Sequence, residues 1–119
     1  MNGKSAGDVS FETVKAIALA LPSVREGITH GSPSLYVGKK FMGCIRDDGE
    51  TLVWKVAIVE RDLLVQLEPH KYFITDHYVP FDYVLVRLSE VDEAEIGELA
   101  RKAWRMLALK TLVKAHPEI

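Results

Sequence analysis

The sequence predicts an α+β domain built on a single antiparallel sheet of about five strands, with helices on one face of the sheet. Two observations predict this class. Three segments with apolar residues at helical spacing are separated by short runs in which apolar and polar residues alternate. These runs mostly follow one another through tight turns, which favours an antiparallel meander over a parallel sheet with alternating helices. The predicted order of elements is therefore α-β-β-β-α-β-β-α.

The first helix is predicted to begin after Ser10, a residue type that caps helix N-termini through its hydroxyl group. Apolar residues then recur at helical spacing from Phe11 to Leu21. Pro22 disfavours helical geometry in the residue before it, so we expect the helix to end at Leu21. The following segment, residues 23–33, is polar and has the composition of turns.

Strands are predicted where the period of the apolar pattern changes to two. Gly38-Lys39 separates the first two strands and suits a tight hairpin, because glycine accepts a positive φ. Asp48-Gly49 forms the next turn, and a loop containing Pro80 separates the last two strands. The strands are expected at residues 34–37, 41–46, 51–57, 72–74 and 83–88.

Two further helices complete the order. Residues 59–68 carry leucines at helical spacing and are expected to form the second helix. In the last helix, Asp92 and Glu95 have the spacing of a capping box. The first turn of that helix is acidic and its later turns are basic, which complements the helix dipole. We expect it to continue to about Lys114.

Alternation along the strands assigns their residues to two faces of the sheet. We expect the helix-covered face to carry Leu35, Val37, Phe41, Ile45, Leu52, Trp54, Val56, Val84, Val86 and Leu88. We expect the opposite, open face to carry Tyr36, Cys44, Arg46, Lys55, Tyr83 and Arg87.

Length and composition are those of an ordinary globular domain, with 119 residues, 48% hydrophobic, 27% charged and a net charge of −2. A chain of this length can bury its own core, and its single cysteine, Cys44, fits a reducing compartment. No signal-peptide pattern opens the chain, and no apolar run is long enough to span a membrane. We expect a cytoplasmic protein in which residues 1–9 are a flexible N-terminus and residues 10–119 form one domain.

An ordered series of short motifs covers nearly the whole chain. It consists of Leu19-Ala20-Leu21-Pro22, Glu26, His30-Gly31-Ser32-Pro33, Tyr36-Val37-Gly38-Lys39, Leu52-Val53-Trp54-Lys55, Tyr83-Val84-Leu85-Val86 and Ala103-Trp104. In this series the sequence resembles the MmcQ/YjbR family, although Tyr83 stands where many members have tryptophan. The resemblance implies the double-wing fold, which is similar to the frataxin-like α+β arrangement. It also implies DNA binding, a label that the family commonly carries while its members are described as of unknown function.

Nucleic-acid binding would depend on local basic patches, because the whole chain is slightly acidic. One candidate patch lies on the last helix and extends to Lys110 and Lys114, and another lies in the hairpin turn. A third lies on the open face, where basic side chains alternate with tyrosines that can stack bases. Each patch also has a structural explanation, in the helix dipole or in the contact of an exposed sheet with water. The candidate residues are Lys39, Lys40, Lys55, Arg87, Arg101, Lys102 and Arg105.

Catalysis has less support. Glu26, His30 and Ser32 are residue types used in acid-base and nucleophilic chemistry. Their spacing is equally explained by a turn that leads into the first strand, so we interpret Glu26 and His30 as residues that structure this loop. A contact between the two would hold the loop in place. We therefore expect a protein that is not an enzyme.

No cofactor or metal is expected either. The four histidines lack the spacing of a metal site, and phosphate-loop and dinucleotide motifs are absent from the sequence. The iron handling suggested by a frataxin-like shape needs an acidic first helix, whereas residues 10–21 contain one acidic residue, Glu12. The alternative to DNA binding is a protein-interaction or small-ligand module on the open face, with a homodimer as one form of it.

Overall fold

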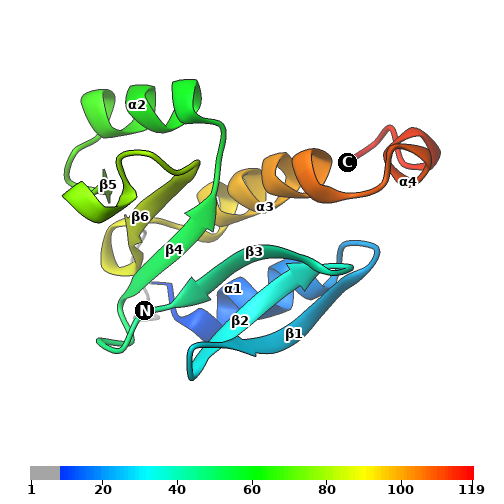
Figure 1. Cartoon of the computed structure of the whole chain (residues 1–119), viewed down its shortest axis with the longest axis horizontal. Coiled ribbons are helices and arrows are strands. Elements are labelled where there is room, and N and C mark those ends of the chain that lie inside the picture. The colour runs from blue at the N-terminus through cyan, green and yellow to red at the C-terminus, as the bar shows by residue number, and fades with distance from the viewer. Residues whose placement is uncertain (1–8) are drawn as a thin grey trace, which may run out of the picture.

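Six antiparallel strands form one sheet in the computed structural model, which describes residues 9–119. Their order across the sheet is β1-β2-β3-β4-β6-β5. Figure 1 shows α1 and α3 on one side of this sheet and α2 beyond β4 and β6. The strands are β1 (Val24–Thr29), β2 (Ser32–Val37), β3 (Lys40–Ile45), β4 (Thr51–Lys55), β5 (Tyr72–Phe73) and β6 (Tyr83–Arg87).

The helices confirm the α+β class expected from the sequence. Ser10 caps the first helix by accepting a hydrogen bond from the Thr13 N–H, and Asp92 and Glu95 form the expected capping box. No helix within residues 9–119 is both long enough and apolar enough to cross a membrane. The helices are α1 (Phe11–Leu19), α2 (Ile58–Leu67), α3 (Glu93–Leu107) and α4 (Lys110–Ala115), with short 3-10 helices at η1 (Asp76–Tyr78) and η2 (Leu88–Glu90).

Most of the expected flexible N-terminus lies outside the described residues. Val9, its last residue, is buried, and its N–H donates to the Leu88 carbonyl over 3.2 Å. This bond joins the start of the described chain to the residue that follows β6.

The sequence pattern does not reveal β1. Val24 to Thr29 pairs with β2 along its whole length, in a segment where the sequence indicates only turns. As an edge strand, β1 has no fully buried residue, so it carries no alternating apolar signal. His30 and Gly31 connect the two strands, both with positive φ (51° and 82°), as in a type I′ hairpin.

The prediction of one continuous last helix is wrong, because the helix is broken between Leu107 and Lys110. Ala108 and Leu109 have extended backbone geometry, with ψ values of 154° and 143°. After the break, Leu112 and Val113 of α4 pack against the core. Tertiary packing therefore overrides the helical propensity of this segment.

The prediction that Phe41 lies on the helix-covered face is also wrong. A register shift between β2 and β3 pairs Leu35 with Gly43 and Tyr36 with Phe41, so that β3 has one extra residue, Met42. This β-bulge turns Phe41 to the open face and buries Met42 in its place. The other nine residues that we assigned to the helix-covered face belong to the buried core.

Two buried tryptophans form hydrogen bonds between different elements of the core. Trp54 and Trp104 are both fully buried. The Trp54 Nε1 donates to the Leu99 carbonyl of α3 over 3.0 Å, and the Trp104 Nε1 donates to the Pro22 carbonyl over 2.8 Å. Each indole therefore combines a large buried apolar area with a satisfied polar atom.

Part of the opposite face is covered, although the sequence predicts it to be open. Val53 and Leu85 lie on that face and are buried. Residues 76–82 run beside β6, below α2 in Figure 1, and Tyr78 borders a hollow with Val53 and Cys44. Arg61 of α2 holds this segment, because its Nη1 donates to the carbonyls of Tyr78, Val79 and Phe81.

Replacement of Gly43 tests the bulge. A Cβ at this position would lie 2.3 Å from Trp54 Cε3 and 2.6 Å from the Val53 carbonyl oxygen. We expect Gly43→Ala to lower the free energy of unfolding by roughly 2–3 kcal/mol or more, measured by urea titration. The control is Gly97→Ala in α3, where the nearest atoms outside the helix backbone belong to the flexible end of Arg101. Equal unfolding midpoints for Gly43→Ala and the wild type would contradict the close contact.

Arg61 provides a second test. Arg61 Nη1 donates to the three carbonyls while Nε and Nη2 contact the Asp62 carboxylate, and the single ammonium of lysine cannot hold both groups, so Arg61→Lys leaves carbonyls of residues 78–81 without a donor. We expect a loss of about 1–3 kcal/mol in stability and faster amide exchange in residues 76–82. Arg46→Lys, at an exposed arginine, is the matched control. Unchanged exchange in Arg61→Lys would show that other contacts hold the segment.

The buried side chain of Tyr72 should make the stability of the fold depend on pH in the alkaline range. Burial, with a smaller contribution from Glu95 and Glu68, raises the pKa of Tyr72 to about 12. An unfolded tyrosine ionises near pH 10, so the unfolded chain loses this proton first and stability falls as the pH rises from about 10 to about 12. Urea unfolding of the wild type and Tyr72→Phe at increasing alkaline pH measures this. Parallel loss of stability in both proteins would exclude Tyr72 as the cause.

Candidate nucleic-acid interface

Two segments that carry basic residues meet at one end of the molecule. The β2–β3 turn lies beside the α3–α4 junction, and together they line two adjoining hollows of about 380 and 430 Å³. Lys40, Ala108 and Leu109 border both hollows. We call this region the cationic end, defined by Lys39, Lys40, Arg105, Lys110 and Lys114.

The five cations of the cationic end are exposed. Within residues 9–119, none of them takes part in an ion pair. Neither hollow has an aspartate or glutamate in its lining. This end of the protein therefore presents five positive charges that form no ion pair with a carboxylate of residues 9–119.

The turn that positions Lys39 and Lys40 is fixed on two sides. Gly38 has a φ of 60°, which places a glycine at the first position of a two-residue hairpin turn. The Gly38 N–H donates to the Ser23 carbonyl over 2.8 Å, and the Arg25 Nε donates to the Gly38 carbonyl over 2.7 Å. These bonds hold the two lysines in place without using their ammonium groups.

The floor between the cations is apolar. Val37, Leu107 and Leu112 line the first hollow, while Leu109 is 73% exposed at its edge. The break between α3 and α4 creates this surface, because it brings Leu109 and Leu112 beside the hairpin. The sequence contains no breaker residue between 107 and 110 that would have indicated it.

The structure places the other candidate cations in internal contacts. Lys55 pairs with Asp82 over 2.8 Å, Arg101 with Glu98 over 2.8 Å, and Lys102 with Glu60. Arg87 donates to the Pro69 carbonyl, and its guanidinium lies 4.1 Å from the centre of the Phe73 ring. Of the seven candidates, Lys39, Lys40 and Arg105 are therefore the ones that share the cationic end.

Three rings form a row across the uncovered part of the open face. Tyr36 and Phe41 contact edge to face with centroids 5.9 Å apart, and Phe41 and Tyr83 do so at 5.6 Å. The Arg25 guanidinium lies 4.6 Å from the Tyr36 ring centre, and the Lys55 ammonium lies 5.0 Å from that of Tyr83. We call Tyr36, Phe41 and Tyr83 the aromatic row.

Phe41 is the member of this row that the sequence pattern misplaces. Strict alternation assigns it to the core, and only the bulge reverses this. The glycine at position 43 is the one sequence signal of a bulge or close approach in this strand.

Glu26 and His30 form no hydrogen bond or ion pair with each other among the described residues. Glu26 is bound to Lys15 of α1 at 3.5 Å, while His30 occupies the β1–β2 turn and is exposed. Burial raises the pKa of the Cys44 thiol, which keeps it protonated and weakens it as a nucleophile. Within residues 9–119, no three His, Cys, Asp or Glu side chains come together as a metal site would require.

The sheet and its helices define a small α+β domain of the double-wing class. The family model described as YjbR matches residues 19–106. The chain belongs to the YjbR family, which confirms the resemblance seen in the sequence.

The relatives are similar over part of their length. The chain is 44% identical over 52 residues to uncharacterized protein Rv2570 of Mycobacterium tuberculosis (strain H37Rv) and, equally, to uncharacterized protein Mb2600 of Mycobacterium bovis. This match covers 44% of the chain and 40% of each relative. Neither relative is named for an activity.

A solved structure has the same fold. It is the crystal structure of Deinococcus radiodurans protein DR2400, with the domain DUF419, which aligns with a TM-score of 0.71 at 19% identity. The alignment covers 89% of this chain and 86% of that one. At this identity the likeness establishes the fold alone.

Proposed function

We propose that this protein binds nucleic acid through phosphate contacts at the cationic end. The observation that carries the proposal is the set of five exposed cations, brought together from two segments and without an ion pair among the described residues. Lysine and arginine that neutralise phosphates release condensed counterions, and this release drives binding. The DNA-binding label implied by the family resemblance points in the same direction.

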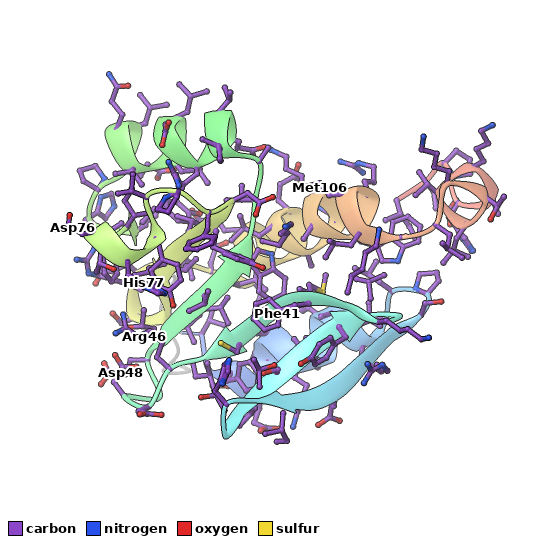
Figure 2. All side chains as sticks on the ribbon, in the orientation of Figure 1. Phe41, Arg46, Asp48, Asp76, His77 and Met106 are labelled. Atoms are coloured by element: carbon purple, nitrogen blue, oxygen red, sulfur yellow. The ribbon has the colours of Figure 1, made fainter. Side chains whose placement is uncertain are left out.

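The slightly negative net charge does not oppose this proposal, because acidic residues gather elsewhere. Asp47, Asp48 and Glu50 lie in the β3–β4 turn, at the far end of β3 from Lys40. Figure 2 shows Arg46 and Asp48 at that end, well away from Met106 beside the cationic end. Such charge separation orients an approaching polyanion toward the cationic end.

The alternative is a protein-interaction or small-ligand module on the open face, including a homodimer. Residues 76–82 and α2 cover the part of that face where Val53 and Leu85 are buried. A partner on that face therefore has less surface to contact than the sequence predicts. Nucleic-acid binding at the cationic end is the better supported function.

Removal of two unpaired cations tests the proposal. We expect Lys39→Gln with Lys40→Gln to weaken binding to a short mixed-sequence duplex and to reduce the slope of log K against log salt by about 1 to 2. Fluorescence anisotropy titrations at two or more salt concentrations measure both quantities. Arg46→Gln is the matched control, because Arg46 is exposed and lies at the opposite end of β3.

Two results would overturn the proposal. One is the absence of salt-sensitive binding at low salt by the wild-type protein, where phosphate contacts are strongest. The other is binding by the double variant that matches the wild type in affinity and in salt slope.

A further inference from the structure

We infer that the hollow between the β2–β3 turn and the α3–α4 junction binds a small amphipathic anion. The apolar part of this ligand fills the hollow, and its carboxylate or phosphate group contacts Lys39 and Lys40. The inference goes beyond the proposed function, because phosphate contacts use the cations and leave the apolar lining without a role. We call this site the junction hollow; it is the hollow of about 380 Å³ described above.

The junction hollow has apolar walls that the fold already holds in place. Val37 and Leu107 are buried members of the core, and Leu112 packs against the same core. Core side chains keep their rotamers, so little order has to be gained when a ligand binds. A volume of about 300–1,000 Å³ and an apolar lining with a few charged groups are typical of small-molecule sites. The junction hollow has both properties.

Leu109 gives the junction hollow an exposed apolar edge. Its side chain is 73% exposed, and it borders both this hollow and the adjoining one of about 430 Å³. A hydrocarbon chain that covers Leu109 removes two apolar surfaces from water at once. Each methylene group buried in this way should tighten binding about three- to fourfold. A chain longer than the junction hollow can continue past Leu109 into its neighbour.

The charge at the rim selects an anion. Lys39 and Lys40 line the junction hollow, are exposed and form no ion pair within residues 9–119. No aspartate or glutamate of that range lines the hollow. Hydrogen bonds from Gly38 to Ser23 and from Arg25 to Gly38 fix the turn, so the backbone positions of both lysines are set before a ligand arrives. An acidic group at the rim therefore meets two ammonium groups and no lining carboxylate.

The two parts of the site call for one ligand that has both characters. An ion pair with an exposed lysine is weak in water, so a small inorganic anion gains little here. A neutral hydrocarbon gains from the apolar walls but leaves the charge at the rim unmatched. In an amphipathic anion the apolar part supplies the affinity, and the acidic group supplies the selectivity and the orientation.

Backbone amide chemical shifts of the isotope-labelled protein test the inference during titration with decanoate, kept below its micelle concentration. We expect saturable shifts centred on Lys39 and Leu109. Decanol has the same chain without the charge and should bind about tenfold more weakly. Hexanoate has four fewer methylene groups to bury and should bind roughly a hundredfold more weakly. Decyl phosphate should also bind, and the tighter of the two anions identifies the acidic group.

Variants separate the two parts of the site. Leu109→Asn removes the apolar edge and should weaken decanoate binding about tenfold. Leu67→Asn is the matched control, because Leu67 is also 73% exposed but lies on α2, outside the junction hollow. Lys39→Gln with Lys40→Gln should weaken decanoate binding about tenfold and leave decanol binding unchanged. This double variant is an independent test should Leu109→Asn fold poorly by circular dichroism.

Three results would overturn the inference. The first is the lack of saturable decanoate shifts near Leu109, and the second is equal binding of decanoate and decanol, or of decanoate by Leu109→Asn and the wild type. The third is a set of shifts near Leu109 that depends on protein concentration without ligand, because a second copy of the chain would then cover the hollow. Failure of a duplex to bind would overturn the proposed function alone, since the decanoate titration needs no nucleic acid.

Discussion

The contact between Gly43 and the indole of Trp54 fixes the geometry of both faces of the sheet. The indole approaches Gly43 so closely that any side chain there would overlap it. Its Nε1 also donates to the Leu99 carbonyl, so one ring joins β3, β4 and α3. Because the bulge adjoins this contact, Met42 enters the core and Phe41 turns outward. The packing of one tryptophan thus decides which ring the open face presents.

Basic side chains with and without internal partners lie in different parts of the molecule. Most basic side chains along the helices and strands are held by carboxylates or carbonyls, as Lys102 is by Glu60 and Arg61 is by the segment from 78 to 81. The hairpin turn and α4 are different, since their lysines have no such partners among the described residues. A chain that is slightly acidic overall can therefore present a strongly positive end.

Much of the fold follows from the sequence, since alternation places nine core residues and the caps place two helix starts. What it misses depends on tertiary contacts. β1 is held by pairing at an edge where nothing is fully buried, and the helix break at Ala108 serves the packing of Leu112. For the site, the sequence identifies Lys39, Lys40 and Arg105, but not the ion pairs that occupy Lys55, Arg101 and Lys102. The Lys55 and Lys102 pairs join residues from different elements, which spacing does not encode, whereas Arg101 and Glu98 have the i,i+3 spacing of a helix pair.

The most direct test is a map of backbone amide chemical shifts while a short mixed-sequence duplex is added to the isotope-labelled protein. We expect progressive shifts in two places: the turn around Lys39 and the α3–α4 junction around Leu109. The acidic turn around Asp48 should remain unchanged. Shifts centred on that turn or on α1, or no shifts at low salt, would contradict nucleic-acid binding at the cationic end.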